Sequence, residues 1–273
     1  MSKSRKITVS YLTTHELSTA EAVHAAAAIG ADFISARLTV TPPGGKVYPL
    51  MSDPAEVRAA RAAIQDTEVA IYDVEVARLG PDTVAAQFAP MLDIAAQLGA
   101  RSLLTTAHGP DETQLADQFA QLCELAAGYG VSVDLEFLPW NSIGTLPAAT
   151  RILTHASQPN AGLVVDAIHW YRADGNVADE LRKLPASWFH FAQICDAPAA
   201  RPASMEQIMF HAREERLNPG EGGLDLAALF AAIPRETAIA MEVPKYELSK
   251  TVPAIDRARA CLEATRALLA KLD

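Results

Sequence analysis

Short apolar runs alternate with longer amphipathic stretches rich in Ala and Leu along most of the chain. The short runs are nearly continuous rather than interrupted by polar residues, which is typical of parallel strands covered on both faces. They predict strands at 7–13, 32–38, 69–77, 101–107, 131–138, 161–169, 188–195 and 238–243. The stretches between them predict helices at 18–30, 53–65, 83–98, 111–129, 146–156, 177–183, 225–232 and 253–271.

This strict alternation of eight strands with eight helices leaves two architectures, a closed (βα)8 barrel and an open doubly wound sheet. The count of eight favours closure. No GxGxxG follows the first strand, which argues against a dinucleotide-binding fold. No linker rich in Pro, Gly or Ser divides the 273 residues. We therefore expect an α/β fold, a single (βα)8 TIM barrel in one domain over 1–273, with its longest irregular stretch at 196–224.

Composition and charge narrow the classes of partner. The formal net charge of −10 disfavours nucleic acid and anionic membrane surfaces, because both attract basic proteins. No apolar run reaches the roughly 18 residues of a membrane span. The three cysteines are widely spaced and the N-terminal residues contain no long apolar segment, so we expect a reducing, cytoplasmic location. For the oligomeric state, a homodimer is the default expectation.

Oxygen-bearing side chains follow four consecutive predicted strands, where the active site of a TIM barrel lies. They are Glu136, Asp166, Gln193 and Glu242. Three carboxylates facing one space repel each other, and a divalent cation would remove that conflict. Carboxylate and amide oxygens are hard ligands, so the pattern favours Mg²⁺ or Mn²⁺, with Co²⁺ or Zn²⁺ as alternatives.

Other side chains near these strand ends are candidates for contacting a ligand. His169 follows Asp166 by three residues, and His108, Arg37 and Trp140 follow strands four, two and five. Each also has a purely structural interpretation, such as a helix cap for His169. Three cations are available to meet an anionic group on the substrate, namely Arg37, Arg216 and Lys245.

Several segments give the chain a resemblance to a known family. The strand bearing Glu136 and the segments "VVDAIH", "QICDAP", "RLNPGEGGLDL" and "MEVP" resemble the xylose-isomerase-like TIM-barrel superfamily, often called sugar phosphate isomerases/epimerases. The resemblance covers nearly the whole chain and implies one divalent metal bound by Glu136, Asp166, Gln193 and Glu242. Gln193 stands where many members have His, a variant similar to the 3-dehydroshikimate dehydratases. The resemblance also implies that His169 and Arg216 contact substrate.

The implied activity is that of a metal-dependent isomerase or epimerase of sugars or sugar-like polyol or keto compounds. Such an enzyme abstracts a proton next to a carbonyl, forms a metal-stabilised enediolate and returns the proton elsewhere; Glu136 and Glu242 are the candidates for these transfers. The alternative is a carbon–oxygen lyase, a dehydratase of the 3-dehydroshikimate or inosose type, in which His169 protonates the leaving hydroxyl. The same four ligands serve both reactions, so both stay open.

Two further classes fit less well. The endonuclease branch of this barrel needs more His ligands and a basic face, whereas this chain has seven scattered His residues and a negative charge. A barrel that has lost its activity would have no need of an intact set of four ligands.

Overall fold

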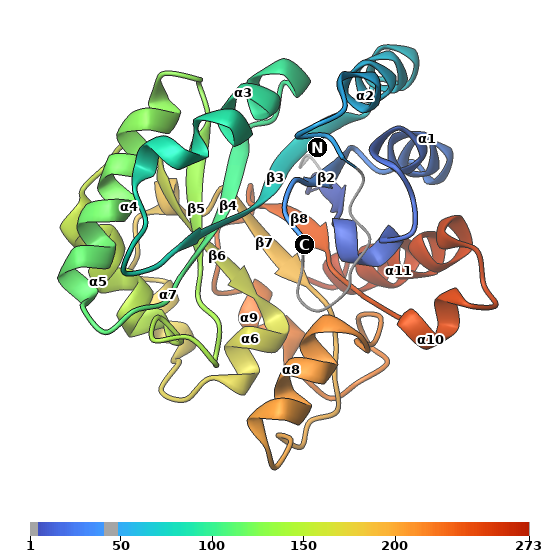
Figure 1. Ribbon diagram of the computed structural model, residues 1–273. Helices are drawn as coiled ribbons and strands as arrows, with labels where there is room; N and C mark the ends of the chain where they lie inside the picture. Colours follow the sequence, from blue (N-terminus) through green and yellow to red (C-terminus); the bar gives the residue numbers. More distant parts are fainter. Residues whose placement is uncertain (1–4, 41–48, 273) are drawn as a thin grey trace.

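The computed structural model describes residues 5–40 and 49–272, and within them eight parallel strands close into a barrel in the order β1 to β8, as Figure 1 shows. This confirms the (βα)8 fold. The strands are β1 (Ile7–Val9), β2 (Phe33–Arg37), β3 (Ala70–Leu79), β4 (Ser102–Ala107), β5 (Ser132–Glu136), β6 (Ala161–Asp166), β7 (Phe191–Ile194) and β8 (Ala238–Met241). Pairing of β1 with β8 completes the ring.

The helices lie outside the barrel and cover its strands (Figure 1). They are α1 (Thr19–Ile29), α2 (Pro54–Thr67), α3 (Ala89–Leu98), α4 (Glu112–Ala127), α5 (Leu146–Ala156), α6 (Ala167–Arg172), α7 (Ala178–Leu181), α8 (Met205–Arg213), α9 (Leu226–Phe230), α10 (Tyr246–Ser249) and α11 (Ala254–Leu269). Three short 3-10 helices, η1 (Tyr11–Thr14), η2 (Ala85–Phe88) and η3 (Ala186–Trp188), lie in the connections between strands and helices. None of these described helices has the length and apolar character to cross a membrane.

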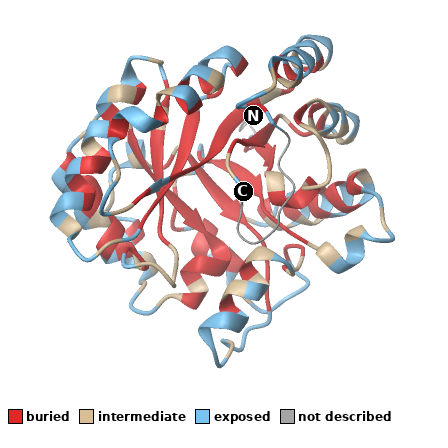
Figure 2. Ribbon diagram, viewed as in Figure 1, coloured by how far each residue is buried: buried red, intermediate tan, exposed pale blue. Residues whose placement is uncertain are grey.

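Burial explains the alternation of the sequence. Figure 2 shows the strands buried and the outer faces of the helices exposed. A large apolar cluster fills the layer between strands and helices, and a small one fills the barrel itself. The inner cluster consists of Phe33, Tyr72, Val76, Leu104, Val164, Phe191, Ala238 and Ala240. Because these side chains fill the barrel interior, a ligand can bind only outside the inner cluster, at an end of the barrel.

Several predicted strands extend too far, including the one expected at 188–195, of which only Phe191–Ile194 forms a strand. The strand expected at 7–13 ends at Val9, and the chain then turns into η1. The strand expected at 161–169 ends at Asp166, so 167–169 were assigned wrongly. The Asp166 carboxylate accepts hydrogen bonds from the backbone N–H groups of Ile168 (2.8 Å) and His169 (3.3 Å). An Asp that satisfies two N–H groups in this way starts a helix, here α6.

The stretch 196–224 is also less irregular than predicted, because it contains α8. Ser204 caps this helix by accepting from the backbone N–H of Gln207 at 3.2 Å. After α8 the chain returns to the end of β7, where Asp196 and Leu217 form an isolated antiparallel bridge. This return carries Arg216 back to the mouth of the barrel.

Candidate functional site

The four polar side chains predicted from the strand ends lie at one end of the barrel. Asp166 and Gln193 are direct neighbours on β6 and β7, and Glu136 ends β5. The backbone N–H of Glu242, just past β8, donates to the carbonyl of Ile194 at 3.1 Å. Their exposed fractions are only 0% to 6%. The barrel therefore places three carboxyl groups and one amide in a nearly dry space.

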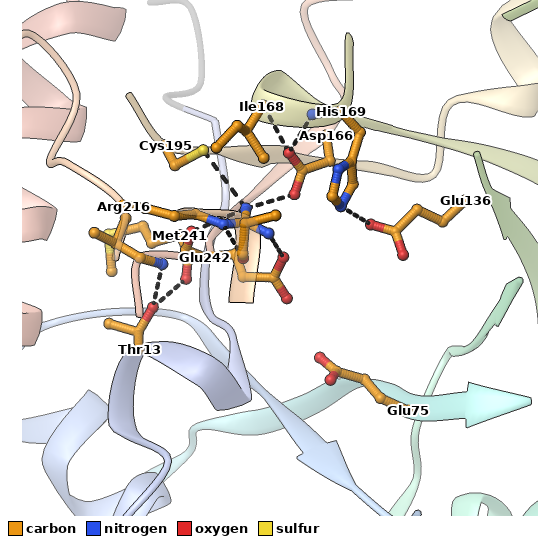
Figure 3. Close-up of polar contacts among 12 residues, drawn as sticks. Thr13, Glu75, Glu136, Asp166, Ile168, His169, Cys195, Arg216, Met241 and Glu242 are labelled. Carbon is orange, nitrogen blue, oxygen red and sulfur yellow. Dashed lines mark hydrogen bonds and ion pairs between the residues drawn. The ribbon is translucent and has the colours of Figure 1, made fainter. Parts of the chain in front are cut away.

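Arg216 supplies a positive charge inside this space. Its Nη1 lies 2.6 Å from Asp166 Oδ2, and its Nη2 lies 2.9 Å from Glu242 Oε2. Its Nε donates to the carbonyl of Ala212 at 2.7 Å, which fixes the plane of the guanidinium. Figure 3 shows the guanidinium between the two carboxylates. Arg216, expected to contact substrate, is thus also bound to two of the predicted metal ligands.

One group of side chains that could hold a metal ion includes His169. Ligand atoms of Glu136, Asp166 and His169 lie within 4.8 Å of one another, and Glu242 is outside this group. His169 Nε2 lies 3.6 Å from Glu136 Oε1 (Figure 3). The described structure therefore brings His169, predicted to contact substrate rather than the metal, up to the carboxylates themselves.

Burial and mutual repulsion shift the acidities of these groups. Burial raises the pKa of Glu136 well above its ordinary value, and the charges of Glu242 and Asp166 add to it. Burial also raises the pKa of Glu242 to about 8, against the opposing charge of Arg216. Burial penalises the charged form of Asp166 as well, but Arg216 outweighs it and the pKa falls. Burial lowers the pKa of His169 to about 4, so its imidazole is neutral at pH 7.

The donor set fits a divalent cation. Gln193 Oε1 is buried and accepts no hydrogen bond from the described residues. The Glu136 carboxylate likewise has no hydrogen-bond donor among them, only the His169 ring at 3.6 Å. A buried oxygen without a partner costs on the order of 1–3 kcal/mol, and a hard cation is a partner that such oxygens suit.

The loop after α8 is built around the carboxylate of Asp196. Asp196 Oδ2 accepts from the backbone N–H groups of Gly220 (2.9 Å) and Gly222 (3.0 Å), and Oδ1 accepts from Leu224 (3.1 Å). A Cβ on Gly222 would lie 2.3 Å from Asp196 Oδ1. The "PGEGG" segment is therefore a tight turn that binds an internal carboxylate, and it anchors the segment that carries Arg216.

A cavity of about 280 Å³ opens above this cluster. Seven of the nine predicted site residues line it: Arg37, His108, Glu136, Trp140, His169, Arg216 and Glu242. The other two, Asp166 and Gln193, are not among its lining residues. The cavity is small compared with typical ligand pockets and suits a compact molecule.

Neighbouring groups orient three of these lining residues. Arg37 Nη2 lies 2.7 Å from Glu75 Oε2, and both side chains are buried. His108 Nδ1 accepts from the backbone N–H of Ser142 at 3.0 Å, which leaves its Nε2 to carry the proton when the ring is neutral. The rings of Trp140 and His169 pack nearly perpendicular to each other, with their centroids 5.1 Å apart.

Sequence reasoning missed two cations that also line the cavity, Arg78 and Arg213. Arg78 follows the predicted end of strand three by one residue, because β3 runs on to Leu79. Arg213 ends α8, within the stretch interpreted as irregular. Ser204 is the signal in the sequence, because a helix predicted to start there would have identified Arg213 as a residue at its end.

The comparisons with known proteins agree with this architecture. The family model described as "Xylose isomerase-like TIM barrel" matches residues 23–268. The chain is 35% identical to the 3-dehydroshikimate dehydratase of Pseudomonas aeruginosa over 123 residues, 44% of this chain and 18% of that protein. It is 29% identical to the inosose isomerase of Bacillus subtilis over 122 residues, 43% of this chain and 40% of that protein. The alignments thus span less than half of either relative.

Among solved structures, a crystal structure described as "IOLI protein with a binding zinc atom" has the same fold. Its TM-score is 0.78 at 20% sequence identity, over 98% of this chain and 99% of that one. The zinc belongs to that protein, and the likeness to this chain is one of fold.

Proposed function

The chain belongs to the xylose isomerase-like TIM barrel family, and from that premise we propose that it is a divalent-metal-dependent isomerase or epimerase of small, hydroxylated carbonyl compounds. The observation that carries the proposal is the buried set of oxygens at the carboxyl end of the barrel, in which Gln193 Oε1 lacks a partner among the described residues. Such a set costs free energy when empty and fits a cation.

The residues proposed to bind the metal are Glu136, Asp166, Gln193 and Glu242. When bound, a divalent cation stabilises the negative charge that develops on the substrate oxygens during proton abstraction. Arg216 already neutralises part of the charge on Asp166 and Glu242 through its two ion pairs. His169 lies beside Glu136, where it limits the directions open to that carboxylate.

The two glutamates are the proposed proton carriers. Both line the cavity and are reached by a substrate that enters it. In the protein without a cation, burial raises the pKa of both Glu136 and Glu242, and a bound cation would lower both again. Removal of a proton beside a carbonyl by one glutamate and its return by the other, to a neighbouring carbon or the opposite face, is isomerisation or epimerisation.

A dehydratase of the 3-dehydroshikimate or inosose type is the second candidate. Two observations support it: the amide of Gln193 in the ligand set, and the 35% identity to a 3-dehydroshikimate dehydratase. In that reaction His169 would deliver the proton to the leaving hydroxyl. Its neutral ring reaches the cavity beside Glu136, which is compatible with proton exchange between the two side chains.

Deuterium uptake tests the proposal. The protein is dialysed against chelator, reloaded with Mg²⁺, Mn²⁺, Co²⁺ or Zn²⁺, and incubated in D₂O with ketoses, inosose and 3-dehydroshikimate under NMR observation. Metal-dependent exchange with the hydroxyl groups retained supports an isomerase or epimerase. Metal-dependent loss of water with a new double bond supports the lyase. Absence of any metal-dependent exchange or dehydration would contradict both.

A further inference from the structure

Two arginines lining the cavity have no carboxylate partner. Arg78 donates to Thr39 Oγ1 at 3.0 Å and to the carbonyl of Val40 at 3.4 Å. The guanidinium of Arg213 lies over the Trp140 ring, 5.2 Å from its centroid. Neither forms an ion pair with an acidic side chain of the described residues. Both are therefore positive charges at a ligand cavity that no carboxylate of the described residues contacts directly, although Glu75 acts on Arg78 and Glu214 on Arg213 from further away.

The cations predicted from the sequence to meet an anion differ from these two. Arg37 lies 2.7 Å from Glu75, and Arg216 lies 2.6 Å from Asp166. Lys245 lies 3.1 Å from Glu221 and is not among the lining residues of the cavity. Each of the three is already paired with a carboxylate.

The positive charges at the cavity also act on one another. Burial lowers the pKa of Arg78, the positive charges of Arg37 and Arg213 lower it further, and the charge of Glu75 opposes them. Like charges collected in a partly desolvated cavity repel, and a bound anion removes the repulsion.

We propose that Arg78 and Arg213 bind an oxyanion of the substrate, a carboxylate or a phosphate. The inference rests on the proposed function, since it concerns the substrate of the same cavity. A guanidinium presents two N–H groups that match the paired oxygens of a carboxylate or phosphate. Packing of Arg213 on Trp140 restricts its movement and so lowers the entropy lost on binding.

The size of the cavity limits the ligand to a compact acid or phosphate ester. A volume of about 280 Å³ is at the low end for ligand sites, which suits a single ring or a short open chain. The charge also bears on the reaction, because 3-dehydroshikimate carries a carboxylate whereas inososes are neutral. An oxyanion site that prefers the carboxylate would favour the lyase.

Calorimetric titration with matched probes tests the site without turnover. The probes are quinate against its uncharged methyl ester, and fructose 6-phosphate against fructose. Each is titrated into wild-type protein, Arg78→Gln and Arg213→Gln, with Mg²⁺ and separately with chelator. The control is Arg61→Gln, an arginine that lines a separate cavity beside α2.

We expect one charged probe to bind wild-type protein at least about tenfold more tightly than its neutral partner. We expect each cavity variant to remove most of that preference and Arg61→Gln to keep it. Circular dichroism checks that the variants are folded. Preference for quinate identifies a carboxylate, and preference for fructose 6-phosphate a phosphate.

The site is refuted if neither charged probe binds better than its neutral partner. It is also refuted if folded Arg78→Gln and Arg213→Gln both keep the wild-type preference. Failure of the proposed function gives a different result, since metal-dependent deuterium uptake would then be absent while charge-selective binding persisted with and without Mg²⁺.

Discussion

The barrel interior contains buried carboxylates at two levels, and their surroundings differ. At the lower level, Asp134 of β5 is fully buried, and its carboxylate accepts a hydrogen bond from the Ser102 hydroxyl. Its Oδ1 also lies 2.8 Å from His190 Nδ1. Two residues further along the same strand, Glu136 has no hydrogen-bond donor among the described residues.

The surroundings of Asp134 therefore differ from those of Glu136. Asp134 is compensated by neighbours from β4 and from the start of β7, so the protein gains nothing from a further partner. Around Glu136, Gln193 Oε1 and His169 Nδ1 are both buried without a hydrogen-bond partner in the described structure. Unsatisfied polar atoms persist where another requirement, here ligand binding, opposes stability.

The largest expected effect contrasts the two levels directly. Glu136→Gln should lower turnover by about 10²–10⁴-fold, because a proton carrier and metal ligand is lost. Its unfolding midpoint should stay the same or rise, since an isosteric neutral group replaces a charge that burial disfavours. Asp134→Asn should do the opposite. Its free energy of unfolding should fall by about 1–3 kcal/mol, whereas turnover of the folded enzyme should stay near normal. Denaturant unfolding and assays of the two variants measure both effects.

The space around Asp134 should also leave no room for a larger side chain. Gly162 of β6 is the direct neighbour of Asp134 on β5, and a Cβ on Gly162 would lie 1.8 Å from Asp134 Oδ1 and 2.5 Å from His190 Nδ1. Gly162→Ala should therefore lower the free energy of unfolding by about 1–3 kcal/mol or more. Gly99→Ala is the control for space, because its Cβ would meet nothing within 4 Å, although its positive φ adds strain. A smaller loss for Gly162→Ala than for Gly99→Ala would contradict the packing described.

A smaller effect is expected from the loop that supports Arg216. In Asp196→Asn, one carboxylate oxygen that accepts from the loop N–H groups is replaced by an NH₂ group. We expect turnover to fall by about 10-fold, because supporting partners of a metal site contribute on the order of 10–100-fold. A positioning role predicts a lower kcat with a changed pH profile, whereas a purely structural role predicts only a lower unfolding midpoint.

The smallest predicted effect is a pH dependence of stability from the lower level. The hydrogen bond to Asp134 raises the pKa of His190, against the opposing effect of burial. The resulting stabilisation is fully present below the unfolded pKa of about 6.5 and is lost as the pH rises through the higher folded value. The advantage of wild type over His190→Gln in free energy of unfolding should thus be larger near pH 5.5 than near pH 9. An advantage that grows with pH would contradict the assignment.

The sequence was sufficient for the architecture because the relevant signals are local. Periodicity and apolar runs located all eight strands, and polar residues at their ends indicated which end of the barrel carries chemistry. Errors arose where one residue has two local interpretations. Asp166 ends an apolar run and also caps a helix, so the strand was extended into α6.

The electrostatic partners were beyond sequence reasoning, because they are long-range. Arg216 reaches Asp166 across 50 residues, and Arg37 reaches Glu75 from the neighbouring strand. The sequence identified Arg37 and Arg216 as candidates for binding an anionic group of the substrate. Only the fold shows that each already forms an ion pair with a carboxylate. Within residues 5–40 and 49–272, the same fold gives Arg78 and Arg213 no ion pair with a carboxylate.

The most direct test of the central claim is a titration of Mn²⁺ into chelator-treated protein, followed by electron paramagnetic resonance. Wild-type protein is compared with Glu136→Gln and Gln193→Leu, and with Glu263→Gln, which removes an exposed carboxylate on α11. The account predicts one tightly bound ion in wild type and Glu263→Gln, and affinity reduced by at least about tenfold in the other two. Absence of a tight ion in wild type, or equal affinity in all four proteins, would contradict the proposed metal site.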